Sequence, residues 1–222
     1  MILHEALATL ESLGSAQNRK TYTRHGAGQN LYGVSFANLG AMKQKIKVDH
    51  ALAQGLWATG NFDARLLATM VADPAQATAA ELDNWVSHVD GYPLADALSK
   101  FAAATPLARS KMEQWMKSKQ EFTAAAGWDI FSSLARQSGA LTGGYVQERL
   151  SYLEAHIHKA QNRVRHAMNS AVIAIGLHSP EMRELAFAAA ARIGKVTVDH
   201  GETGCQTPDA AAYIRKVLAR VK

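Results

Sequence analysis

Apolar residues recur every three or four positions along most of the chain, which is the spacing of one face of an α-helix. In the first such segment, over residues 2–13, Leu3, Leu7, Leu10 and Leu13 form a single stripe. The same spacing predicts eleven further helices, at residues 35–47, 49–58, 61–72, 79–88, 93–103, 107–118, 121–137, 144–159, 163–175, 180–193 and 208–221. Alternating β-branched runs, which are typical of strands, are almost absent.

One N-terminal segment departs from this pattern. Residues 16–30 are polar and basic and contain glycines, so we expect a loop that becomes ordered on contact with a partner.

Several predicted helix boundaries carry capping residues. Thr78 and Glu81 have the spacing of a capping box, in which each side chain accepts a hydrogen bond from the other residue's backbone N–H. Gly60, Gly176 and Gly194 are expected just past helix ends, where a left-handed backbone is needed. Short connections between helices predict antiparallel hairpins. We therefore expect an all-α fold, an α-solenoid of helical hairpins forming one domain over residues 1–222, with a globular multi-helix bundle as the alternative.

Composition narrows the class of protein. Of 222 residues, 48% are hydrophobic and 19% charged, which is typical of a globular chain and excludes a disordered one. The lone Cys205 excludes an internal disulfide framework. There is no apolar run of about 20 residues and no signal-peptide pattern, so we expect a cytoplasmic protein without a membrane partner. The net charge of +5 permits nucleic-acid binding without requiring it.

Motifs for metals and cofactors are missing from the sequence. His156 and His158 are two residues apart on a helix and face different sides, so they cannot bind one metal together. The segment from His200 to Cys205 is glycine-rich and is expected to be a structural connector. No phosphate-binding loop or dinucleotide fingerprint occurs. We expect no metal, no nucleotide and no other cofactor.

Five segments carry a resemblance to a known family. They read YGVS (32–35), DHALAQGLWATG (49–60), DARLLATMVADP (63–74), DNWV (83–86) and YPLAD (92–96). Together they resemble the DNA alkylation repair enzyme family, whose characterised members are HEAT-like-repeat alkylpurine DNA glycosylases. The resemblance is strongest over residues 31–98 and continues as a helical pattern to about residue 193. It implies a solenoid of HEAT-like hairpins that cradles duplex DNA, alkylated DNA included, against a basic face.

The same resemblance implies an activity, namely the excision of cationic bases such as 3-methyladenine and 7-methylguanine. The family carries a Trp and, four residues later, an Asp on one helix face, and the matching pair in this chain is Tyr92 and Asp96. A fixed carboxylate can stabilise the positive charge that develops on the sugar as the glycosidic bond breaks. The resemblance thus implies a DNA-3-methyladenine-type N-glycosylase with Asp96 as its catalytic residue and Tyr92 at the lesion.

Two family positions differ in this chain. Where the family has Trp-x-Arg-Arg, the matching segment ends in Ala124 and Ala125, and a later family Trp matches Ser170. Trp128 lies one turn along the same predicted helix and is a candidate substitute. These departures leave an alternative open: a catalytically inactive member that binds DNA structures, or a helical-repeat scaffold that binds other proteins.

Basic residues in two segments are candidate phosphate contacts. Arg19, Lys20 and Arg24 lie in the predicted loop near aromatic residues, a combination that suits a nucleic-acid backbone. Arg163 and Arg165 flank the later repeat and form the second candidate group.

Overall fold

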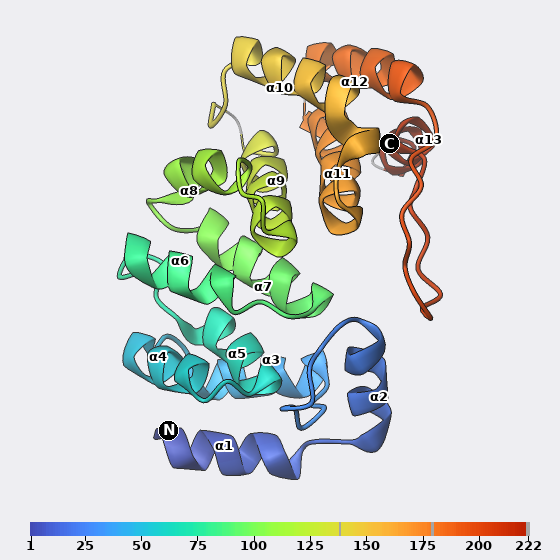
Figure 1. Ribbon diagram of the computed structural model, residues 1–222. Coiled ribbons are helices and arrows are strands. Elements are labelled where there is room, and N and C mark those ends of the chain that lie inside the picture. Colours follow the sequence, from blue (N-terminus) through green and yellow to red (C-terminus); the bar gives the residue numbers. More distant parts are fainter. Residues whose placement is uncertain (138, 179, 221–222) are drawn as a thin grey trace. The chain divides into compact units, whose positions relative to one another are not determined.

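The computed structural model describes residues 1–137, 139–178 and 180–220, and within these ranges it contains helices and no strands (Figure 1). The predicted all-α class is therefore confirmed. The elements are α1 (Leu3–Ser12), α2 (Ala16–Arg24), α3 (Phe36–Ile46), α4 (His50–Ala58), α5 (Phe62–Val71), α6 (Ala79–Ser87), α7 (Tyr92–Ala103), α8 (Ala108–Trp115), α9 (Glu121–Ala135), α10 (Gly143–His156), the 3₁₀-helix η1 (Ile157–Lys159), α11 (Asn162–His178), α12 (Pro180–Ile193) and α13 (Ala210–Leu218). No helix within the described ranges is both long and apolar enough to cross a membrane.

The contacts between Cα atoms group the chain into two compact units. Unit 1 comprises Met1–Ala108 together with Gly201–Thr203, and it contains α1 to α7. Unit 2 comprises Arg109–His200 together with Gly204–Lys222, and it contains the later helices. One domain over the whole chain stays a prediction.

The core of unit 1 is built around α5, which packs against α3, α4 and α7. Because α5 is covered on several sides, most of its apolar residues and even its Asp63 are buried. Trp57 of α4 and Trp85 of α6 stack face to face, with ring centroids 4.4 Å apart and planes 4° apart. Large aromatic surfaces buried in this way contribute strongly to the stability of a core.

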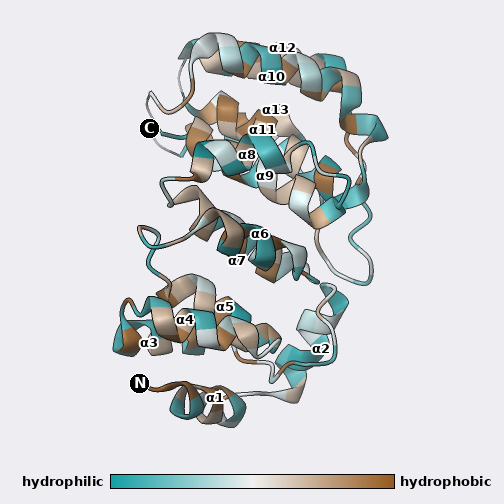
Figure 2. Ribbon diagram, turned by 60° about the vertical axis from the view of Figure 1, so that its left-hand side comes forward, coloured by the Kyte–Doolittle hydropathy of each residue, from teal (hydrophilic) through white to brown (hydrophobic). Residues whose placement is uncertain are grey.

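Residues 16–24 form the helix α2, so the predicted loop is wrong over this stretch. Ser15 caps the helix by accepting a hydrogen bond from the backbone N–H of Asn18. Figure 2 shows α2 as predominantly hydrophilic, without the stripe from which the other helices were predicted. One aromatic residue holds it instead: Tyr22 is buried, and its hydroxyl donates to the Val34 carbonyl oxygen at 2.6 Å. Burial raises the pKa of Tyr22 to about 12, and the Asp63 carboxylate adds to this rise.

In unit 2, α11 packs against α9, α12 and α13 and forms the centre of the core. Gly127 of α9 lies so close to the end of α8 that an added Cβ would be 2.4 Å from the backbone nitrogen of Met116. Gly176 lies inside α11, not beyond its end, so its predicted capping role is wrong. A Cβ at Gly176 would approach Ile214 of α13 to 2.4 Å, so close packing explains this glycine.

The other predicted helix ends agree with the structure in part. Gly60 and Gly194 adopt the left-handed backbone expected of them, with φ of 69° and 70°. Thr78 caps α6 by accepting from the backbone N–H of Glu81. The Glu81 carboxylate lies 3.3 Å from His50 Nε2, so it serves the contact with α4.

Candidate nucleic-acid interface

Tyr92 and Asp96 lie on the first and second turns of α7. Their spacing of four residues puts both side chains on one face of the helix, as the sequence predicts. Asp96 is exposed and Tyr92 is half-buried. The backbone N–H of Tyr92 donates to the His25 carbonyl oxygen at 3.0 Å, and the two rings meet edge to face with centroids 6.4 Å apart. The start of α7 is therefore joined to the end of α2.

Two glycines, one after α2 and one before α7, allow this junction. A Cβ added to Gly91 would lie 3.0 Å from the backbone nitrogen of Ala27, a tight contact that the two backbones could accommodate only by moving apart slightly. Gly26 has φ of 91°, a left-handed conformation that side-chain-bearing residues rarely adopt. Both glycines fix α2 beside the residues that open α7.

The basic residues of α2 are exposed on the surface of unit 1. Lys20 and Arg24 are four residues apart and share a helix face, and Arg24 directly precedes the His25 that contacts Tyr92. Arg19 donates from Nη1 to the Tyr32 carbonyl oxygen at 3.1 Å, so part of its guanidinium braces the following segment. The structure thus brings the predicted basic group and Tyr92 together in one unit.

Asp63 holds the segment between α2 and α3, a role that sequence reasoning missed. Its carboxylate is fully buried and accepts three backbone hydrogen bonds, from Tyr32 at 2.6 Å, Gly33 at 3.0 Å and Val34 at 2.7 Å. The backbone N–H of Phe62 adds a hydrogen bond to the Asn30 carbonyl oxygen. These contacts anchor the return of the chain from α2 on the first turn of α5.

The two arginines of α11 differ from the surface position that we expected for them. Arg163 is only 8% exposed, and its backbone N–H donates to Oε1 of Glu121 on α9 at 2.6 Å. Its Nη1 lies 3.0 Å from Nδ1 of His166. Burial, together with the nearby Arg163 and His200, lowers the pKa of His166 to about 4. Arg163 therefore lies inside unit 2.

Arg165 is half-buried, and its guanidinium donates to the carbonyl oxygens of Thr197 and Ala160 at 2.8 and 2.9 Å. It holds the segment that follows α12 against α11. Neither arginine of this pair extends freely from the surface, and we leave both out of the candidate interface.

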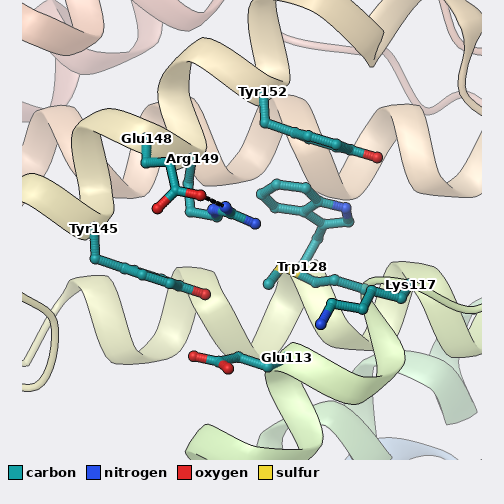
Figure 3. Close-up of a pocket in the computed structure, with 8 residues that line it drawn as sticks. Glu113, Lys117, Trp128, Tyr145, Glu148, Arg149 and Tyr152 are labelled. Atoms are coloured by element: carbon teal, nitrogen blue, oxygen red, sulfur yellow. Dashed lines mark hydrogen bonds and ion pairs between the residues drawn. The ribbon is translucent and has the colours of Figure 1, made fainter.

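Trp128 is buried in α9, where it stacks on Tyr152 of α10 with ring centroids 5.8 Å apart. It also lines a cavity of about 400 Å³ in unit 2 (Figure 3). The other lining residues are Glu113, Met116, Lys117, Tyr145, Glu148, Arg149 and Tyr152.

The positions at which this chain departs from the resembled family lie on α9 and α11. Ala124 and Ala125 are 4% and 0% exposed, in a part of α9 that packs against α11. Ser170 on α11 is half-buried. The short side chains at these positions offer no cation to a phosphate. Across the described ranges, the structure brings together no group of three or more His, Cys, Asp or Glu residues that could hold a metal ion.

Comparison with known proteins gives matches along nearly the whole chain. The family model described as "DNA alkylation repair enzyme" matches residues 6–214. The uncharacterized protein Lin0241 of Listeria innocua is 28% identical over 232 residues, with 100% of both chains covered. The uncharacterized protein Lmo0209 of Listeria monocytogenes is 28% identical over 233 residues, again with 100% of both chains covered.

A solved structure is similar throughout. It is described as "a new family of proteins related to the HEAT-like repeat DNA glycosylases with affinity for branched DNA structures". It superposes with a TM-score of 0.92 at 27% identity, covering 100% of this chain and 95% of that one. This likeness confirms the predicted HEAT-like helical-repeat fold.

Proposed function

Because the chain belongs to the DNA alkylation repair enzyme family, we propose that it is a DNA-binding repair protein that recognises branched DNA. The observation that carries the proposal is the likeness to the solved protein with affinity for branched DNA, since it extends over 100% of this chain. The buried Ala124 and Ala125 favour binding without base excision, because the arginines that the resembled family has there are missing.

The exposed side of α2 supports DNA binding, because it carries cationic side chains. Lys20 and Arg24 on one helix face can neutralise neighbouring phosphates, and such contacts are the main source of affinity for DNA. Tyr92 and His25 lie beside Arg24 and offer rings to a base that is unstacked at a branch point. We therefore assign the DNA backbone to α2 and the branch to the start of α7.

Fluorescence anisotropy with labelled branched and linear DNA, measured over a series of salt concentrations, tests the proposal. Branched DNA is expected to bind more tightly, and Lys20→Ala and Arg24→Ala should each reduce the salt slope by about one. Lys216→Ala, a change of an exposed lysine on α13, is the matched control and should leave the slope unchanged. Equal affinity for both DNAs, or no binding at low ionic strength, would contradict the proposal and favour a protein-interaction scaffold.

Base excision is the second candidate function, and the shared face of Tyr92 and Asp96 on α7 favours it. Incubation with DNA that contains 7-methylguanine or 3-methyladenine would release the base faster than spontaneous depurination. Asp96→Asn should then lower release by about a hundredfold with little change in DNA affinity, because it removes only the stabilisation of transition-state charge. Release at the spontaneous rate would exclude the glycosylase.

The cytoplasmic location expected from the sequence stays a prediction.

A further inference from the structure

The cavity of unit 2 has an aromatic lining that packing alone does not require. Trp128 of α9 and Tyr145 and Tyr152 of α10 contribute three rings to it. Tyr152 is 40% exposed although it stacks both on Trp128 and on His156, the latter with ring centroids 4.1 Å apart. A large aromatic side chain that remains exposed beside a cavity is available to a ligand.

Cationic side chains lie against these rings. The Arg149 guanidinium is 5.1 Å from the centroid of Tyr145 and 5.8 Å from that of Tyr152. Arg109 lies 3.9 Å from the Tyr145 centroid. Tyr145, Arg149 and Tyr152 are spaced by four and three residues, so they share one face of α10. This face presents alternating aromatic and guanidinium groups to the cavity.

Two buried donors at the cavity lack hydrogen-bond partners among the described residues. They are the Tyr145 hydroxyl and Nε of Arg149. A buried donor without an acceptor destabilises the folded protein, so each of these two groups needs an acceptor, which water or a bound ligand can supply. A tyrosine hydroxyl is protonated at neutral pH and can donate, and burial, with a further effect of Glu113, raises the pKa of Tyr145 above its usual range.

The opposite side of the cavity carries one negatively and one positively charged side chain. Figure 3 shows Glu113 and Lys117 across from Arg149, with the Tyr145 hydroxyl between Arg149 and Glu113. A ligand that fits this lining is planar, has faces for stacking, and carries both acceptors and donors on its edge. Nucleobases have this chemistry, because every base has a π-face and an edge with hydrogen-bonding groups. The volume of about 400 Å³ lies within the usual range for small-ligand cavities.

We propose that this cavity binds one unpaired nucleobase of a DNA strand, stacked against the rings and the Arg149 guanidinium, with Glu113 accepting from its edge. The inference rests on the proposed function, because a branch point is where a DNA strand exposes unpaired bases. It adds a second contact on unit 2, separate from the α2 surface of unit 1.

Titration of the full chain with a short oligothymidylate, which has no duplex, tests the cavity directly. Trp128 is the tryptophan that lines the cavity, so stacking of a base should change its fluorescence, and the change should disappear in Trp128→Phe. Tyr152→Leu and Arg149→Gln should each weaken binding by about fivefold or more, which corresponds to the loss of one stacking contact. Tyr152→Phe keeps the ring and should bind as the wild type does. Tyr213→Leu, a change of an exposed tyrosine on α13, is the matched control.

The outcomes separate this inference from the proposed function. If branched DNA binds but the oligothymidylate does not, or if Tyr152→Leu and Arg149→Gln bind it normally, the cavity assignment is overturned and the function stands. If thymidine monophosphate binds as tightly as the strand, the cavity belongs to free nucleotides and the assignment is likewise overturned. If neither DNA binds, both proposals fail. Thermal unfolding of each variant shows whether a loss of binding comes from a loss of folding.

Discussion

Replacement of Asp63 by alanine should release the segment that joins α2 to α3. The carboxylate accepts hydrogen bonds from the backbone N–H groups of Tyr32, Gly33 and Val34, and Gly33 and Val34 are buried. Alanine offers no acceptor, so these donors lose their partner while the chain around them keeps water away. Because α2 has little apolar surface of its own, it depends on this attachment and on Tyr22 to stay folded.

The magnitude follows from the number of buried donors. A buried donor left without a partner costs about 1–3 kcal/mol, and breaking a buried charged contact from one side costs about 3–5 kcal/mol. With two donors fully buried and one partly so, we expect a loss of about 3 kcal/mol or more. For a chain of about 150–250 residues this lowers the melting temperature by roughly 6–12 °C.

Differential scanning calorimetry measures the loss, and hydrogen exchange followed by mass spectrometry locates it. Exchange should rise in Ala16–Arg24 and in residues 30–35, well beyond its rise elsewhere in unit 1. Asp73→Ala is the matched control, because that carboxylate accepts from Ala75 and Gln76 at an exposed position and should matter little. A melting temperature within about 2 °C of the wild type, with α2 still protected, would refute the reasoning.

Three further predictions concern packing and pH. Gly127→Ala should destabilise the protein by about 1–3 kcal/mol in urea unfolding, because its Cβ would meet the backbone of Met116, whereas Gly40→Ala, with open space around it, should stabilise α3 by about 0.5–1 kcal/mol. His166 has a folded pKa of about 4, below its ordinary 6.5, so the stability of the protein should fall as the pH drops from 6.5 toward 4. This loss of stability should be smaller in His166→Gln, and equal pH profiles of the two proteins would contradict the prediction. Tyr22 has a folded pKa of about 12 against 10 unfolded, so stability should fall as the pH rises above 10, and thermal melting of Tyr22→Phe should show no such contribution.

Most of the helices could be predicted because each buries a stripe of apolar side chains against its neighbours. Helix α2 could not, since the only residue it buries is Tyr22, and the glycines after it suggested a loop. The predicted position of Gly176 at a helix end is wrong for a related reason. A glycine near the end of a helical pattern usually marks a cap, and only the tertiary contact with Ile214 shows that it serves close packing.

The candidate interface was predictable where it depends on local spacing. Tyr92 and Asp96 share a face because they are four residues apart, whatever the rest of the fold does. Arg163 is buried in unit 2, and its backbone N–H donates to Glu121, which is 42 residues earlier, so no local pattern of the sequence shows this placement. In the sequence, Asp63 looks like an ordinary acidic residue of a helix's first turn, where such residues are favoured. Its three hydrogen-bond donors come from a segment about 30 residues earlier, so local spacing does not show them.

The hydrogen bond from the Arg163 backbone to Glu121 has a consequence for how such a chain can diverge. It ties the first turn of α9 to the first turn of α11, and the two helices also pack against each other, so exchanging one without the other would break these contacts. In the sequence, α10 stands between these two helices, and its face toward the cavity carries Tyr145, Arg149 and Tyr152. Tyr145 and Tyr152 contact Phe131 and Trp128 of α9, so substitutions there also affect α9. Arg149 instead contacts Tyr145, Tyr152 and Glu148 of α10 itself. In recombination or design, Arg149 is therefore the position on α10 at which the lining of the cavity can be varied with the least effect on the paired helices.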